Sequence, residues 1–325
     1  MKTQKNASHL VNGRYRNLSG QEAKGLGPLL KWFLSRKPEP WPRKVENESY
    51  PAPGKPDPGH WSITFINHST FLLQTRRYAI LTDPIFSERA SPVRFAGPRR
   101  VRRPGIELRD LPSIDLILLT HNHYDHFDVP SLVALASEHS PVVVTLPGNG
   151  KLLPKARWSK IIELDWWQSH CFGSSLNIAA APAEHFSGRT LWDRNRALWG
   201  SFVLRDEALQ IFIAGDSAYG THFAEIKSRY GVMNVSLLPI GAFRPKWFMQ
   251  AIHMDPAGAV RAHLDLQSQI SIPMHYGTFQ LADEGIDEPL TDLRRAAESL
   301  SPNQGKLEAM GFGESRDFSG TATPK

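Results

Sequence analysis

The stretch IDLILLTHNHYDHFD (114–128) joins a continuous apolar run to a dense set of metal-binding side chains. The apolar part, Ile114–Thr120, predicts a strand buried on both faces. Imidazole nitrogens and carboxylate oxygens suit zinc, with manganese or iron as alternatives. The stretch therefore predicts a metal site at the end of a buried strand, built from His121, His123, Asp125 and His126.

Three further candidate ligands stand at the ends of later predicted strands. His185 follows NIAAAPAE (177–184), Asp216 follows IFIAG (211–215) and His275 follows SIPM (271–274). A catalytic zinc takes three protein ligands and keeps one position for water, so seven candidate ligands exceed what one ion uses. Two metals that share one bridging carboxylate use all seven, and the sequence thus predicts a dinuclear centre.

The composition limits the class of protein. The chain has 325 residues with a formal charge of +6, and 41% of its residues are hydrophobic, enough for a sizeable core. Its one cysteine, Cys171, excludes an intrachain disulfide and any zinc cage of several cysteines. No apolar run approaches the roughly 20 residues that span a bilayer, and the first residues lack an apolar signal region. We therefore expect a cytoplasmic protein.

The positive charge is concentrated at the start of the chain. The first 60 residues hold 11 Lys and Arg, 5 Asp and Glu, and 8 of the 25 prolines, whereas residues 61–325 hold 27 of each charge type. We therefore predict a basic, Pro-rich N-terminal arm over residues 1–59 and a balanced globular body over residues 60–325. Such an arm can wrap its own domain, remain partly mobile or bind a partner.

The pattern of the body predicts an α/β fold. WSITFIN (61–67), STFLLQT (69–75) and YAILTDP (78–84) indicate a meander of three short antiparallel strands. Beyond them, strands and helices alternate, which favours two sheets between helix layers. The later strands are expected at 114–120, 142–146, 175–181, 200–205, 209–214, 235–240 and 270–273, and helices are expected after Pro130 and at 222–230, 257–266 and 290–300.

These motifs resemble those of metallo-β-lactamase-fold hydrolases, whose signature is HxHxDH followed by a separated His, Asp and His. LLPIGAFRPKWFM (237–249) and HMDPAGAV (253–260) are similar to narrower motifs of the N-acylphosphatidylethanolamine-hydrolysing phospholipase D branch. The resemblance covers roughly residues 60–315. It implies an αββα four-layer sandwich, with the basic arm as an N-terminal extension.

The resemblance also implies how the candidate ligands are divided. The first zinc ion would be held by His121, His123 and His185, and the second by Asp125, His126 and His275, with Asp216 bridging the two. A metal-bridging hydroxide would attack the phosphorus of an N-acylphosphatidylethanolamine-like phospholipid. Phosphatidic acid and an N-acylethanolamine would be the products.

The residues by themselves support a broader set of reactions. They fit metal-assisted hydrolysis of an ester, amide, lactone or phosphodiester. Hydrolysis of a lactone or β-lactam ring by the same dinuclear site is therefore the alternative. All seven ligands are present, which argues against a non-catalytic protein.

Three more residues are expected to contribute to the site. His253 stands just before Asp255-Pro256, which predicts a helix start that favours anions. The resemblance implies that His253, together with Asp125, belongs to the catalytic residues, with His253 donating a hydrogen bond or proton near the substrate phosphate. We expect His68 to fix a turn rather than to bind metal, and Asp83 to orient a ligand histidine.

Two basic segments bear on partners. The six arginines of Arg89–Arg103 either meet phosphate groups or pair with local acids. GPLLKWFLSRK (27–37) either lies in a membrane interface, at the inner face, or docks on its own domain. We expect a phospholipid substrate and no nucleic acid, because the 58 residues between Asp216 and His275 leave no room for the inserted domain of RNA-processing relatives. The oligomeric state is open, with a dimer as one option.

Overall fold

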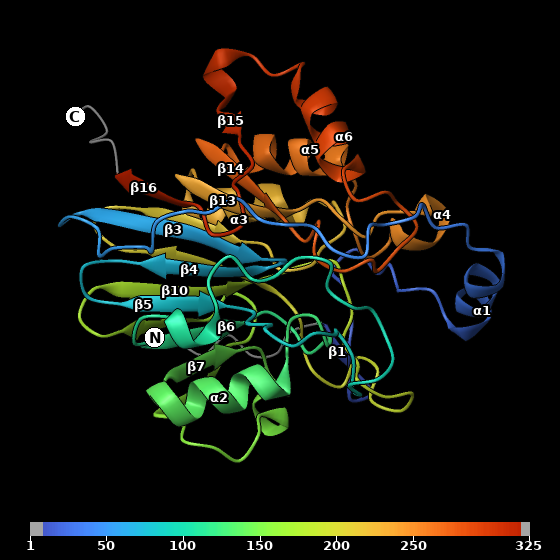
Figure 1. Cartoon of the computed structure of the whole chain (residues 1–325), viewed down its shortest axis with the longest axis horizontal. Helices are drawn as coiled ribbons and strands as arrows, with labels where there is room; N and C mark the ends of the chain where they lie inside the picture. The colour runs from blue at the N-terminus through green and yellow to red at the C-terminus, as the bar shows by residue number, and fades with distance from the viewer. Residues whose placement is uncertain (1–8, 320–325) are drawn as a thin grey trace.

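The computed structural model describes residues 9–319, and its layers are visible in Figure 1. Two seven-stranded sheets stack face to face. Helix α2 covers the outer side of one sheet, while α3, α5 and α6 cover the other. The predicted αββα sandwich is thereby confirmed.

The first sheet has the order β16-β3-β4-β5-β6-β7-β8. Strands β3, β4 and β5 form the predicted antiparallel meander, and β5 to β8 are parallel. Helix α2 (Val129–His139) joins β6 to β7 and begins with Pro130 in its first turn, where a missing N–H costs nothing. The strands are His60–Asn67 (β3), Thr70–Gln74 (β4), Ala79–Thr82 (β5), Leu116–Leu119 (β6), Val142–Thr145 (β7), Lys160–Glu163 (β8) and Ser315–Ser319 (β16).

The second sheet has the order β15-β14-β13-β12-β11-β10-β9. Strands β9 to β12 are antiparallel, and β12 to β15 are parallel. The strands are Ser169–Phe172 (β9), Leu176–Ala181 (β10), Ser201–Arg205 (β11), Gln210–Ile213 (β12), Val235–Pro239 (β13), Ile270–Met274 (β14) and Lys306–Leu307 (β15). The helices are His222–Tyr230 (α3), Lys246–Met249 (α4), Pro256–Leu266 (α5) and Glu288–Ala297 (α6).

The main hydrophobic core lies between the two sheets. Trp61, Phe65 and Phe71 of the first sheet are fully buried in one cluster with Phe202 and Phe212 of the second. Burying a side chain of this size contributes about 1.5–3 kcal/mol, so this layer is a main source of stability. A second cluster fills the space between the first sheet and α2.

The described part of the N-terminal arm lies against the body. It forms a two-stranded ribbon, Leu10–Val11 (β1) with Arg14–Tyr15 (β2), and helix α1 (Leu26–Ser35). The Trp32 ring stacks on Phe248 of α4 at 5.0 Å between centroids, and its indole N–H donates to Asp283. The arm thus docks on its own body, although the division near residue 60 stays a prediction. Among the described helices, none is long and apolar enough to cross a membrane.

Candidate metal centre

The topology gathers the candidate ligands at one edge of the sandwich. Strands β6, β12 and β14 are parallel members of their sheets, and His121, Asp216 and His275 follow their carboxyl ends. Loops after the carboxyl ends of parallel strands meet at the same edge. His185, which follows the antiparallel strand β10, joins them there. All seven candidates except His123 are buried.

The first set consists of the nitrogens that the resemblance assigns to one zinc ion. His123 Nδ1 lies 3.0 Å from His121 Nε2 and 3.1 Å from His185 Nε2. A tetrahedral ion with zinc–nitrogen bonds of about 2.0–2.1 Å places its ligand atoms about 3.3 Å apart. The spacing of these three nitrogens therefore suits one zinc ion.

The second set lies beside the first and shares Asp216 with it. Asp125 Oδ2 is 3.5 Å from His126 Nε2 and 3.3 Å from His275 Nε2. Asp216 Oδ2 is 3.3 Å and 3.2 Å from the same two nitrogens. That oxygen is also 3.8 Å from His121 Nε2. Asp216 therefore stands where a bridging carboxylate would have to be.

The chemistry of this cluster fits a cation. Asp216 Oδ1 and His126 Nε2 are buried polar atoms without a hydrogen-bond partner among the described residues. A buried polar group left unpaired costs roughly 1–3 kcal/mol, and more if it is charged. Two carboxylates and several imidazole nitrogens at one buried point are the donor set that zinc takes.

Burial and mutual contact decide the protonation of these groups. Burial lowers the pKa of His121 well below its ordinary value and that of His123 to about 3, so both imidazoles are neutral. Burial also acts to lower the pKa of His275, but the facing carboxylates of Asp216 and Asp125 outweigh it and raise the pKa to about 9. A metal that binds His275 must therefore displace a proton from the metal-free protein.

Asp83 supports one histidine of each ligand set, His126 directly and His121 through Thr120. Its Oδ2 lies 2.8 Å from His126 Nδ1 and accepts the Thr120 hydroxyl at 2.6 Å. The same hydroxyl oxygen lies 3.0 Å from His121 Nδ1. Each histidine thus has its Nδ1 occupied and turns Nε2 toward the metal position. The predicted orienting position of Asp83 is found, and Thr120 is an addition that the sequence pattern did not reveal.

His68 lies closer to the centre than a turn residue needs to be. Its backbone has φ +49°, as predicted for a turn, and its Nε2 lies 3.0 Å from Asp125 Oδ2. Burial first, and then the neighbouring His275, lower its pKa to about 3. His68 is therefore a neutral donor that holds Asp125, and it lies close enough to the second set to be a further candidate ligand.

Arg189 braces the loop that carries the first four ligands. Its guanidinium donates to the carbonyl oxygens of Asn122 and Phe127 and lies 4.0 Å from the Tyr124 ring centroid. Tyr124 in turn donates its hydroxyl to the Arg189 carbonyl oxygen. The Phe186 ring packs at 4.4 Å on His123. Phe186 and Arg189, which lie shortly after His185 in the chain, thus support the HxHxDH loop.

His253 lies between the metal centre and an open cavity. Its Nδ1 is 3.9 Å from Asp216 Oδ2, and its ring centroid is 5.0 Å from that of His185. The cavity measures about 650 Å³, and its lining includes three basic residues, Lys24, Lys246 and Arg261, and two acidic ones, Glu22 and Asp255. An anionic group in this cavity would meet His253 directly.

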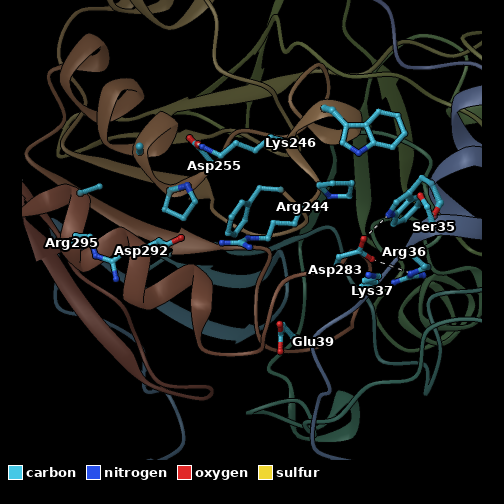
Figure 2. A pocket seen from close by; sticks show the side chains of 17 residues that line it. Ser35, Arg36, Lys37, Glu39, Arg244, Lys246, Asp255, Asp283, Asp292 and Arg295 are labelled. Atoms are coloured by element: carbon cyan, nitrogen blue, oxygen red, sulfur yellow. Dashed lines mark hydrogen bonds and ion pairs between the residues drawn. The ribbon is translucent and has the colours of Figure 1, made fainter.

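A second cavity of about 770 Å³ continues outward from the first, and Figure 2 shows its lining. The two share Phe243, Lys246 and Asp255. Lys246 Nζ and Asp255 Oδ2 form an ion pair at 2.6 Å between them. Helix α1 and the chain that follows it form one wall, where Arg36 pairs with Asp283. The arm thus shapes the approach to the site.

The arginine cluster has a different place. Arg100 is buried, and its guanidinium donates to the carbonyl oxygens of Ser87 and Ile85. Arg102 lies 4.9 Å from the Phe312 ring centroid, and Arg99 pairs with Glu88. None of the six arginines lines either cavity. The structure therefore favours a structural use of Arg89–Arg103 over contact with a substrate phosphate.

Comparison with known proteins gives the same family at several levels of similarity. Residues 78–276 match the Beta-lactamase superfamily domain. An uncharacterized protein of Mycobacterium tuberculosis is 39% identical over 74% of this chain, which spans 65% of that relative. N-acyl-phosphatidylethanolamine-hydrolyzing phospholipase D 1 of Caenorhabditis elegans is 31% identical, with 73% of this chain and 70% of the relative covered. The mitochondrial enzyme of that name in Saccharomyces cerevisiae is 33% identical, covering 71% and 52%.

Solved structures share the fold. A metallo hydrolase from the archaeon Ignicoccus hospitalis superposes with a TM-score of 0.60 at 22% identity, covering 80% of this chain and 98% of that one. The isothiocyanate hydrolase from Delia radicum gut bacteria gives a TM-score of 0.63 at 20% identity, covering 79% and 99%. At this identity the similarity is one of fold and not of substrate.

Proposed function

Because the chain belongs to the Beta-lactamase superfamily, we propose that it is a two-zinc phosphodiesterase of the phospholipase D type. The substrate would be an N-acylphosphatidylethanolamine-like phospholipid, as the names of the worm and yeast relatives suggest. The observation that carries the two-metal assignment is the pair of adjacent His/Asp sets with Asp216 between them. His121, His123 and His185 would hold one zinc ion, and Asp125, His126 and His275 the other.

Two zinc ions held in this way supply Lewis acidity and a water of lowered pKa. The residues of the chain do the remaining work. The overall reaction adds one water: an oxygen–phosphorus bond forms, the phosphorus–oxygen bond on the ethanolamine side breaks, and the departing oxygen takes up a proton. His253, kept neutral because burial lowers its pKa, would donate a hydrogen bond to the phosphate. Lys24 and Arg261 would attract the anionic headgroup into the cavity.

A panel of substrates separates this reaction from lactone or β-lactam hydrolysis, and substitution of His253 tests the role of that residue. The zinc-loaded protein is assayed with an N-acylphosphatidylethanolamine, bis-p-nitrophenyl phosphate, a lactone and a chromogenic β-lactam. We expect turnover of the phosphodiesters only, reduced about 10²-fold or more in His253→Ala while both zinc ions stay bound. Turnover of the rings without phosphodiester cleavage would reverse the order of the two candidates.

Helix α1 supports a lipid substrate by an unusual distribution of its side chains. Its large apolar residues recur at the spacing of one helix face, yet that face points to solvent: Leu26, Leu29, Leu30, Phe33 and Leu34 are 41–77% exposed. Of the whole helix only Trp32 is buried against the body. In Figure 1 the helix stands at the edge of the molecule, away from both sheets.

Charge complements this apolar face. Lys24, Lys31 and Lys37 are exposed on or beside α1, and no acidic residue occurs between Glu22 and Glu39. Basic apolar helices of this kind lie in the interface of anionic membranes. We therefore propose that the enzyme binds to an anionic membrane surface and that α1 inserts into it. The cavity beside His253 would then face the lipid, because Lys24 next to α1 forms part of its wall.

Vesicle binding tests this placement. Wild type should co-sediment with phosphatidylcholine vesicles that contain phosphatidylglycerol, and the double variant Phe33→Ser/Leu34→Ser should bind at least tenfold more weakly. Val133→Ser, at an exposed apolar site on α2, is the control. Turnover of soluble bis-p-nitrophenyl phosphate should not change. Equal vesicle binding by both proteins would refute the placement, as would a dimer that only the double variant disrupts.

A further inference from the structure

Asn17 of the arm is bound to the backbone of a candidate metal ligand 168 residues away. Its Nδ2 donates to the carbonyl oxygen of His185 at 3.0 Å, and its Oδ1 accepts the backbone N–H of His185 at 3.0 Å. The remaining capacity of the amide is also used, by Gln21 at 2.8 Å and the Trp199 indole at 2.9 Å. Asn17 is buried, so these bonds are shielded from water.

His185 needs such a partner because of its place in the chain. It lies between the end of β10 and the start of β11, outside the sheet ladders, and its backbone groups have no other partner among the described residues. The Asn17 amide binds it as a neighbouring strand would. The imidazole is held separately, with Nδ1 2.8 Å from the Ile252 carbonyl oxygen. Backbone and ring together leave Nε2 as the atom that faces the metal position.

A second contact makes the attachment of the arm continuous. The backbone N–H of Ser19 donates to Glu184 Oε1 at 3.1 Å, and its hydroxyl donates to the other oxygen of that carboxylate. Asn17 and Ser19 thus hold two consecutive residues, Glu184 and His185.

We infer that Asn17 is a positioning residue for the first ligand set, so that the N-terminal arm is part of the metal centre. The inference rests on the proposed role of His185 as a zinc ligand but not on any substrate. The alternative is that Asn17 only fastens the arm to the body. Metal binding separates the two, because a simple fastener would not favour one metal position over the other.

The test is metal titration of the purified full chain after removal of metal. In Asn17→Asp the shape and the acceptor oxygen are kept, while the donor to His185 is lost and a charge faces two carbonyl oxygens. We expect one of the two metal equivalents to bind 10–100-fold more weakly and the other to be unchanged. With cobalt as the probe, the visible absorption of that one equivalent should weaken. Asn12→Asp, on an exposed part of the arm, is the control.

Each outcome has one meaning. If wild type binds no zinc or cobalt, the proposed metal centre itself is wrong. The positioning role is overturned if a folded Asn17→Asp binds both metal equivalents as tightly as wild type does. It is also overturned if the variant binds both equivalents more weakly by the same factor. Should Asn17→Asp not fold, hydrogen exchange on wild type decides: metal loading should slow exchange in residues 15–21, and unchanged exchange there would overturn the inference.

Discussion

The position of His275 depends on the absence of a side chain at Gly241. A Cβ at Gly241 would lie 2.0 Å from the His275 carbonyl oxygen, far inside van der Waals contact. His275 has φ +63°, a conformation that the surroundings must hold in place. The backbone therefore has little freedom to yield to an added methyl group.

We expect Gly241→Ala to displace His275 from Asp216 and to weaken zinc binding at least tenfold. Competition with a chelator of known affinity measures this, and circular dichroism checks the fold. Gly27→Ala in α1 meets nothing within 4 Å and serves as the control. Zinc affinity equal to that of wild type would contradict the close packing described here.

At the scale of single residues, the sequence was informative wherever ligands follow strands. HxHxDH and the three strand-end residues named seven side chains that the structure brings together, because the ends of buried strands can be recognised from apolar runs in the sequence. Their assignment as ligands stays a prediction. Asn17 and Thr120 carry no such signal, since an isolated amide or hydroxyl acquires its role only from partners far along the chain.

Among the described α-helices, α5 is the one whose start is capped by a side-chain hydrogen bond. Asp255 is its N-cap, and its Oδ1 accepts the N–H of Gly258 at 2.8 Å. Asp287 occupies the same position in α6 but makes no side-chain capping bond. This pair allows the capping interaction to be measured within one protein.

We expect Asp255→Ala to lower the free energy of unfolding of the metal-free protein by about 1 kcal/mol. The loss of its pair with Lys246 adds little, because the lysine is largely exposed. Asp287→Ala should have a clearly smaller effect, and Asp255→Asn should retain most of the wild-type stability. Urea denaturation followed by circular dichroism provides the values, and equal losses in both alanine variants would show that capping is not the cause.

Several of the strands that the sequence missed have no apolar pattern. Strands β8 and β9 are largely exposed edges, and β16 (SRDFS) is mostly polar. Strand β16 forms only because the chain returns to pair with β3. The buried strands and α2, α3 and α5 were predicted, since burial imposes a period that is visible locally. The helix expected at 290–300 instead runs from Glu288 to Ala297.

Across the whole molecule, each ligand set takes residues from both sheets. His121 and His123 follow β6 of the first sheet, and His185 follows β10 of the second. In the second ligand set, Asp125 likewise follows β6 of the first sheet, and His275 follows β14 of the second. Each bound metal ion should therefore stabilise the complete sandwich by about 2.7 kcal/mol when free metal is at 100 times its dissociation constant.

This stabilisation should depend on pH in a definite direction. In the metal-free fold the pKa of His275 is about 9, above the roughly 6.5 of an unfolded chain. Its proton stabilises the metal-free protein fully below pH 6.5 and is lost as the pH rises through 9. The same proton competes with zinc. The rise in melting temperature on adding zinc should thus be larger at pH 8.5 than at pH 6.5, and calorimetry showing the reverse would contradict the role of His275.

The division of each ligand set between the sheets also has a consequence for the lifetime of the protein in a cell. Two ions bound as proposed would join the two sheets and would have to leave before the sandwich opens, so a metal-loaded molecule would offer proteases few openings. An unloaded molecule opens more readily and is degraded sooner. The supply of zinc would then govern the number of surviving molecules as well as the activity of each one.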